Sequence, residues 1–220
     1  MNAFLARLRP ALALLASLAP IAAAHAQALV DVCRPVEEPV AGGWARYRLR
    51  GTGDSTEMQL ALVGTASWGG APHVWQESLI PTPAGEAVIQ SLVPANPYDP
   101  TTVRRAIMRP PGQAPVEVPA SALAAMKQRA LGAASLDACR TGQAIGWETL
   151  DVPAGRLRAM HVRYSRDGRT ADVWLAPAVP FALVRSVVAG PGGTDPIELV
   201  LIGHGRDAVP TVPLPPEGPP

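Results

Sequence analysis

Lysine and cysteine are scarce in this chain of 220 residues, and neither positive nor negative charge is in excess. With 19 basic and 18 acidic residues, it lacks the basic excess that is typical of nucleic-acid-binding proteins. Lys127 is the only lysine, and Cys33 and Cys139 are the only cysteines. Two cysteines make a poor metal site, and their spacing is not that of a Cys-x-x-Cys redox pair. We therefore expect no nucleic-acid partner and no cysteine-based zinc or dithiol chemistry.

A long uninterrupted hydrophobic run is also missing, which decides how the N-terminus is interpreted. A membrane-spanning helix needs about 20 consecutive apolar residues, whereas Pro20 breaks the N-terminal apolar run. Two arginines precede that run, and Ala24-His25-Ala26 matches the small-x-small pattern of a cleavage site. We expect residues 1–26 to be a signal peptide cleaved after Ala26, leaving a periplasmic protein with no stable membrane anchor.

Export would place the two cysteines in an oxidising compartment. The simplest interpretation there is one disulfide between Cys33 and Cys139, which would tie the N-terminal segment to the middle of the domain. Two free, buried thiols are the alternative.

Alternation of apolar and polar residues dominates the sequence between residues 43 and 205. Trp44–Arg50 places arginines on one face, and Glu57–Gly64 follows after a glycine-containing turn, so the two segments predict a hairpin. Further predicted strands, each bounded by Gly, Pro or Asp, are His73–Ile80, Glu86–Val93, Val103–Arg109, Gly146–Val152, Leu157–Tyr164, Thr170–Leu175, Ala182–Ala189 and Ile197–Ile202. Together these segments predict about ten antiparallel strands.

Two segments depart from this alternation. Ala122–Leu131 has apolar residues at helical spacing, with Ser121 as a candidate N-cap and Gly132 as a helix end. The C-terminal stretch is rich in proline, which predicts an unstructured tail over 209–220. Residues 27–208 are thus expected to form a single, mainly β domain. We expect a curved antiparallel sheet, an incomplete β-barrel, with one central α-helix.

Two short motifs resemble catalytic or nucleotide-binding sequences but lack the partners that such chemistry needs. Gly53-Asp54-Ser55 resembles the nucleophile block of Gly-Asp-Ser hydrolases, but Leu201 stands where an aspartate should precede His204. The glycine motif around His204 leads into Pro210, which excludes the helix that a dinucleotide requires. We predict a non-enzymatic protein with no catalytic residue, no metal and no cofactor. An unrecognised hydrolase is the least favoured alternative.

Tryptophan and methionine supply the candidate ligand-binding residues. Tryptophan on a sheet usually belongs to the core, but the tryptophans could instead form the wall of an apolar cavity, helped by pliable methionine side chains. The sequence leaves both interpretations open. The candidate ligand-binding residues are Met58, Trp75, Met108, Trp147 and Trp174.

Three stretches carry a family resemblance: Gly42–Arg48, Val152–Ala159, and Ala171–Pro180 followed by Leu183-Val184-Arg185. This pattern resembles uncharacterised exported bacterial proteins grouped near the Lol-type (LolA-like) lipoprotein-carrier superfamily. The resemblance implies an incomplete antiparallel barrel with helix on its concave side, which binds acyl chains or senses them. The carriers have several helices, whereas this chain predicts one, and the resemblance supplies no catalytic residue.

We therefore expect a periplasmic, non-enzymatic protein that binds an apolar or lipid-like ligand, or a lipidated partner, inside its curved sheet. The alternative is an envelope interaction or scaffold module with a solid core. In that alternative the arginine-rich face of Trp44–Arg50 would meet an acidic partner, although a solvated face has the same composition.

Overall fold

The computed structural model describes residues 29, 31–33, 41–51, 53–95, 102–123, 133–166, 168–189 and 195–216. The predicted signal peptide, its cleavage site and most of the predicted helix lie outside these residues. Within the described part of the chain, no helix is both long enough and apolar enough to cross a membrane.

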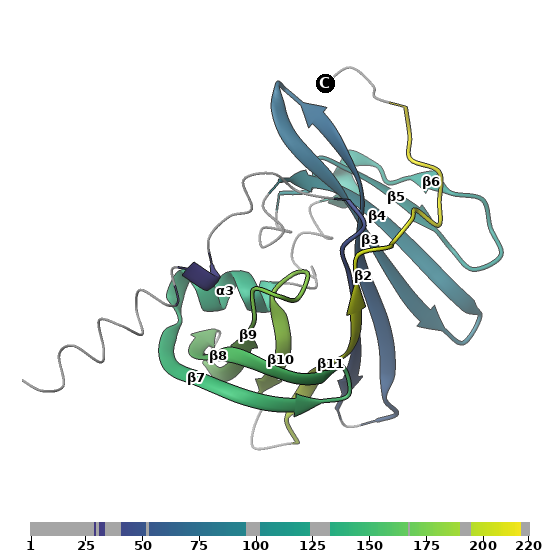
Figure 1. Ribbon diagram of the computed structural model, residues 1–220. Coiled ribbons are helices and arrows are strands. Elements are labelled where there is room, and N and C mark those ends of the chain that lie inside the picture. The colour runs from purple at the N-terminus through teal and green to yellow at the C-terminus, as the bar shows by residue number, and fades with distance from the viewer. Residues whose placement is uncertain are drawn as a thin grey trace, which may run out of the picture.

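A single antiparallel sheet of eleven strands makes up most of the structure (Figure 1). The strands are β1 (Trp44–Arg50), β2 (Thr56–Trp68), β3 (Ala71–Thr82), β4 (Gly85–Pro94), β5 (Arg105–Arg109), β6 (Val116–Glu117), β7 (Gln143–Val152), β8 (Gly155–Arg166), β9 (Arg169–Leu175), β10 (Leu183–Val188) and β11 (Ile197–Gly205). Their order across the sheet is β6-β5-β4-β3-β2-β1-β11-β10-β9-β8-β7. Two meanders, β1–β6 and β7–β11, therefore join where the first strand pairs with the last, and the sheet stays open at β6 and β7.

All ten predicted strands are present, because alternation over five or more residues marks a half-buried strand. The β1–β2 hairpin has the expected pairing, with Arg48 opposite Glu57 on the arginine-rich face. Strand β6 was not predicted, since a strand of two residues carries no periodicity.

The helix prediction is not confirmed. Residues 120–123 are helical, so Ser121 lies inside this turn and is not its N-cap, and residues 124–132 are outside the described part. The helix α3 (Ala133–Thr141) begins just beyond the expected helix end. Its sequence has little apolar periodicity, so its position depends on packing against β8 and β9 and on the Cys33–Cys139 disulfide.

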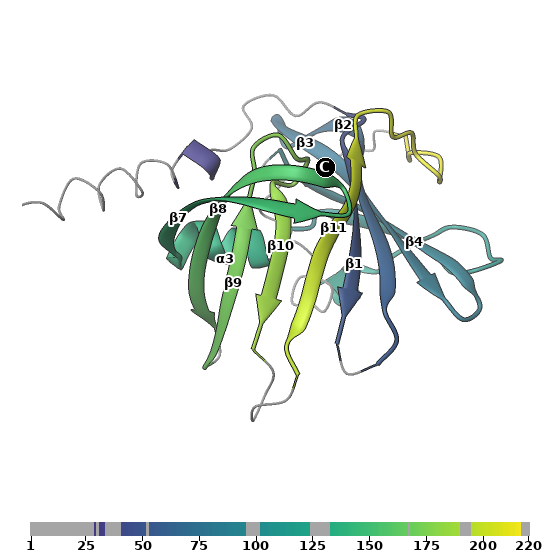
Figure 2. The same cartoon turned by 60° about the horizontal axis from the view of Figure 1, so that its bottom comes forward.

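The two meanders are set at an angle, and α3 lies inside that angle (Figures 1 and 2). We call the face of the sheet against which α3 packs the inner face, and the opposite face the outer face. The largest buried cluster lies mostly on the inner face of β1, β2 and β8–β11. Tyr47 is fully buried within it and donates a hydrogen bond of 3.1 Å to the carbonyl oxygen of Leu183.

The proline-rich segment after β11 is packed on the sheet (yellow in Figure 1). The sequence predicts an unstructured tail over 209–220; residues 209–216 form no helix or strand, and residues 217–220 are outside the described part. The prolines do prevent a strand, but Val212 and Leu214 pack on the outer face of β2–β5. The packing of these two side chains is not indicated by composition.

Candidate ligand-binding face

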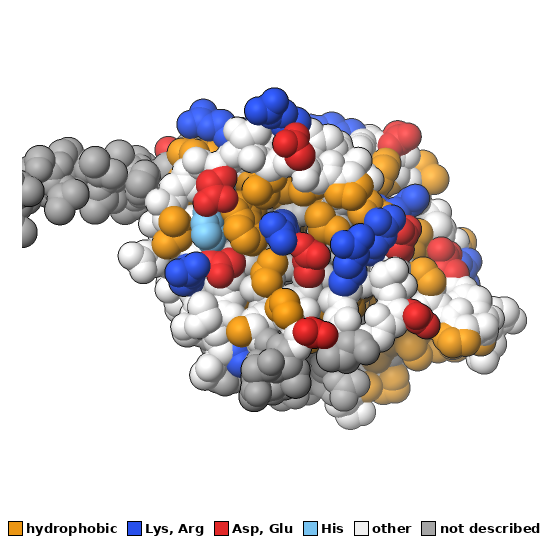
Figure 3. Space-filling model, turned by 90° about the horizontal axis from the view of Figure 1, so that it is seen from below, with side chains coloured by type: hydrophobic (Ala, Val, Ile, Leu, Met, Phe, Trp, Pro, Cys, Tyr) orange, Lys and Arg blue, Asp and Glu red, His pale blue; other side chains and the backbone are white. Residues whose placement is uncertain are grey.

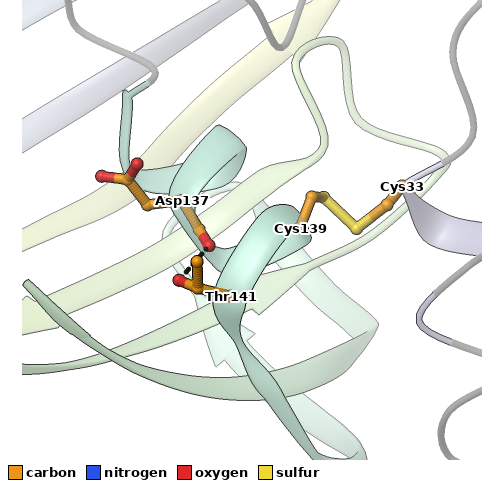
Figure 4. The surroundings of a disulfide bond; sticks show 4 residues. All are labelled: Cys33, Asp137, Cys139 and Thr141. Atoms are coloured by element: carbon orange, nitrogen blue, oxygen red, sulfur yellow. Dashed lines mark hydrogen bonds between the residues drawn. A yellow bond between two sulfur atoms is a disulfide. The ribbon is translucent and has the colours of Figure 1, made fainter.

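One half of the inner face is filled by the protein's own side chains. Met160, Leu175 and Leu201 are fully buried there, and α3 covers β8 and β9. The Cys33–Cys139 disulfide, with Cα atoms 5.5 Å apart, fastens the N-terminal segment to α3 (Figure 4). This half of the sheet is therefore a solid core closed by a covalent staple.

A row of inner-face residues leads out of this core across the other meander. Its members are direct cross-strand neighbours on β2 to β6: Leu60, Ser78, Ile89, Met108 and Val116. We call these five residues, which are apolar except for Ser78, the apolar row. The exposed fraction rises along it, from 3% at Leu60 to 39% at Met108 and 52% at Val116. Within the described part of the chain, the members farthest from the core, from Ile89 onward, belong to none of the three buried clusters. The row therefore ends in exposed apolar side chains at Met108 and Val116.

A buried hydrogen-bond acceptor lies beside the apolar row. Gln76 is two residues from Ser78 on β3, which places the two Cα atoms about 7 Å apart on the same face. Its side chain is 7% exposed, and Oε1 finds no hydrogen-bond partner in the described part of the protein. An unsatisfied buried polar group costs about 1–3 kcal/mol. The inner face thus joins an open apolar surface to an acceptor that lacks a donor.

The five candidate ligand-binding residues from the sequence are not brought together. Met58 and Trp147 pack in or against the filled core, and Trp75 and Trp174 lie on the outer face. Only Met108 belongs to the apolar row.

Sequence reasoning missed Gln76, Ile89 and Val116. One available signal was β4, where Val88 and Ile89 make both faces apolar. A strand with solvent on one side would usually carry a polar residue at one of these two adjacent positions. Nothing in the sequence indicated Gln76, because its importance arises from burial.

A cluster of charged and aromatic side chains lies on the outer face. His161 stacks on Trp174, with ring centroids 4.5 Å apart. Its Nδ1 and Nε2 lie 2.8 Å from Glu148 and 2.6 Å from Asp172. Trp174 Nε1 donates a further hydrogen bond of 2.8 Å to Glu148, and Arg185 lies over the Trp174 ring. These contacts tie the β7–β8 hairpin to β9 and β10.

The two carboxylates of this cluster have pKa values below their ordinary ones. For Glu148, the Trp174 hydrogen bond lowers the pKa most, burial opposes it, and the His161 hydrogen bond adds to the lowering. For Asp172, burial raises the pKa, but hydrogen bonds from Arg163 and His161 outweigh it.

Hydrogen bonds and ring contacts within the cluster join four strands, and each carboxylate accepts hydrogen bonds from its neighbours. Among the described residues, no group of three or more His, Cys, Asp or Glu side chains could hold a metal ion. Figure 3 shows the molecule from below, with basic and acidic side chains interspersed among hydrophobic ones. We therefore assign this cluster a structural role and place the candidate site on the inner face.

Comparisons with known proteins assign no family to this chain. No family model matches it, and no curated protein matches it. A protein assigned as a lipoprotein from Parabacteroides distasonis shares 14% identity at a TM-score of 0.41, over 76% of this chain and 97% of that one. A protein assigned as exported, with a YmcC-like fold, from Bacteroides fragilis shares 11% sequence identity at a TM-score of 0.41, over 76% of this chain and 98% of that one. The structure of MucB in complex with MucA(peri) shares 9% sequence identity at a TM-score of 0.45, over 90% of this chain and 60% of that one.

These identities and TM-scores are too low to transfer a family or a function. The resemblance to Lol-type carriers therefore stays a prediction.

Proposed function

We propose that this protein is an exported, non-enzymatic binding protein that holds an apolar-chain ligand against the apolar row. One observation carries the proposal: the row leaves a filled core and ends exposed at Met108 and Val116. An apolar surface that continues a core without being covered by it marks a place where another apolar group gains by packing. The Cys33–Cys139 disulfide supports the exported, periplasmic setting, because disulfides persist in oxidising compartments.

The size of the open surface limits what binds. From Ile89 to Val116 the row crosses three strands, which spans roughly 10 Å at the usual strand spacing. Each CH₂ group buried there contributes about 0.8 kcal/mol. A segment of an acyl chain matches this surface, and about ten buried CH₂ groups would supply the roughly 8 kcal/mol of a micromolar complex before ordering costs are subtracted.

Gln76 adds chemical selectivity to this apolar surface. A carbonyl oxygen without a donor favours a ligand that carries a hydroxyl or amide N–H near the end of its chain. A carboxylate brings only acceptors and would leave Oε1 unsatisfied. We therefore propose an amphipathic ligand whose polar end is a hydrogen-bond donor, and we expect a fatty alcohol or fatty amide to bind better than a fatty acid anion of equal chain length.

A second candidate function, binding of an envelope protein, is favoured by a pocket on the outer face. Its volume is about 200 Å³, and it lies over β1 to β4. The lining residues are Arg46, Glu57, Met58, Gln59, Leu79, Pro81 and Glu86. Mixed charge around Leu79 and Pro81 suits a protein surface better than a lipid.

The experiment that tests the leading proposal is titration of the delipidated full chain with a fluorescent fatty-acyl probe. We expect saturable binding of one probe per chain. A protein that takes up no acyl probe, while its thermal unfolding remains cooperative, would contradict the proposal and leave the protein-binding alternative.

A further inference from the structure

The outer face of β2–β5 has a groove that is occupied by the chain's own C-terminal segment. Val212 packs on Val88 and Ile107, and Leu214 packs in the cluster of Trp75 and Leu92. We call this surface the tail groove, and residues 207–216 the tail.

The floor of the tail groove contacts the main chain of the tail through two buried polar side chains. Glu77 is 1% exposed and accepts the Thr211 N–H, with its two carboxylate oxygens at 3.1 and 3.3 Å. Gln90 is fully buried, and its Nε2 donates to the Val212 carbonyl oxygen at 2.7 Å and to Glu77 at 2.9 Å. Glu77 and Gln90 therefore do for this proline-rich segment what a neighbouring strand does in a ladder, one accepting an N–H and the other donating to a C=O.

The groove also has a seat for a particular side chain. A Cβ atom at Gly64 would collide with Leu214 Cδ1, so the missing side chain at this position of β2 makes room for the leucine. Beyond Leu214, Pro215 and Pro216 border a small pocket beside Trp68 and Trp75. The seat and the flanking aromatic residues match an extended segment in which apolar residues and prolines alternate.

Glu77 is an unusual residue for a solid sheet face. Among the described residues it forms no ion pair, and burial of a carboxylate costs several kcal/mol unless hydrogen bonds compensate it. The compensation comes from Gln90 and from the Thr211 N–H of the tail. The contacts that hold the tail in the groove involve no sheet ladder, so the tail can leave with every strand pairing intact.

We propose that the tail groove is a binding site for extended proline-rich peptides, which the tail occupies in cis. A partner segment of the same chemistry would exchange with the tail. Its recognition elements are a free N–H before an apolar residue, a proline, a second apolar residue in the Gly64 seat, and further prolines. This inference does not depend on the acyl-ligand proposal, because the groove lies on the opposite face of the sheet.

The test uses the full-length chain carrying Val212→Asp and Leu214→Asp, which should release the tail and empty the groove. A fluorescently labelled peptide with the sequence of residues 207–216 is then titrated into the variant and the unmodified chain. We expect the variant to bind at least about 10-fold more tightly, because a tethered tail competes at a millimolar effective concentration. A labelled peptide with the same two aspartates should not bind.

A change on the groove side completes the design. Gly64→Val, added to the released-tail variant, fills the Leu214 seat with a residue that suits a strand, and should abolish peptide binding. Equal affinity in the variant and the unmodified chain, or binding that survives Gly64→Val, would overturn the proposal. So would an unmodified chain that is dimeric until Leu214→Asp dissociates it, because the occupant would then be a second copy.

A second measurement covers the case in which the released-tail variant does not fold. Excess unlabelled peptide added to the unmodified chain should speed hydrogen exchange at the Thr211 amide, whose partner is Glu77. An exchange rate at Thr211 that stays constant at millimolar peptide would overturn the proposal.

Discussion

Met108 and Val116 are cross-strand partners on the inner face, and both side chains remain exposed at the edge of the sheet. Edge strands are usually protected by charge or by being short. Strand β6 is short, and on the outer face Glu117 pairs with Arg105 at 2.9 Å, so one side of this edge is charged. The inner side of the same edge is apolar. The charged outer side of this edge therefore suits contact with solvent, whereas the apolar inner side suits an apolar ligand.

Met108→Asp should weaken binding of the acyl probe at least about 10-fold, because a carboxylate would have to lose solvation beneath the chain. The matched control is Ile197→Asp on β11, where the exposed fraction is 41% against 39% for Met108. We expect Ile197→Asp to bind the probe like the unmodified protein, as measured by fluorescence titration. Equal losses in the two variants would show that surface charge matters and the apolar row does not.

Gln76→Leu should stabilise the protein and reduce its selectivity. Removing the unsatisfied Oε1 is expected to raise the free energy of unfolding by about 1 kcal/mol, measured by urea denaturation. The preference for a fatty alcohol over the fatty acid anion, expected to be about 3- to 10-fold from one hydrogen bond, should disappear. A variant that loses stability, or keeps the preference, would show that Gln76 has a partner of another kind.

Replacement of both Cys33 and Cys139 by serine should lower the free energy of unfolding by about 2–4 kcal/mol, because the crosslink restricts the unfolded chain. Affinity for the acyl probe should change less than twofold, since the disulfide staples the filled half of the inner face. Urea denaturation and probe titration of the same sample separate the two effects. An unchanged unfolding midpoint would mean that the staple contributes nothing to stability.

Acid should destabilise the protein through Glu148 and Asp172, whose pKa values lie below their ordinary values of 4.5 and 3.8. A carboxylate with a lowered folded-state pKa stabilises the fold above its unfolded pKa, and this contribution is lost as pH falls through the folded value. Thermal unfolding should therefore show a falling Tm below about pH 4.5. Trp174→Phe removes the largest cause of the Glu148 shift and should flatten this fall; an identical pH profile would contradict the assignment.

The strands could be predicted from the sequence because their information is local. The alternation in Trp44–Arg50 alone defines β1 and its two faces. The pairing of β1 with β11 could not be predicted, since it joins segments more than a hundred residues apart. Neither segment has a sequence feature that identifies the strand with which it pairs. The packing of the tail could not be predicted for a related reason: prolines exclude a strand, but the seat for Leu214 exists only once Gly64 and Trp75 are brought together.

The candidate site was harder to predict than the fold. Trp75 and Trp174 are conspicuous in the sequence, yet they pack on the outer face, one beneath the tail and one against His161. Residue type gives an average tendency to bind or to pack, whereas Gln76 and Val116 acquire their roles from burial and exposure in the folded sheet. Met108 was a candidate because methionine on a strand suits both a core and a binding surface, and its role in binding stays a prediction.

The binding of an acyl chain to the apolar row can be tested by mapping where a photoactivatable acyl probe labels the protein. The delipidated full chain is loaded with the probe, irradiated and digested, and the labelled peptides are identified by mass spectrometry. We predict labels on β4, β5 and β6, at or next to Ile89, Met108 and Val116, and a loss of these labels in Met108→Asp. Labels confined to the outer face or to the filled core around Leu175 would show that the apolar row does not hold the acyl chain.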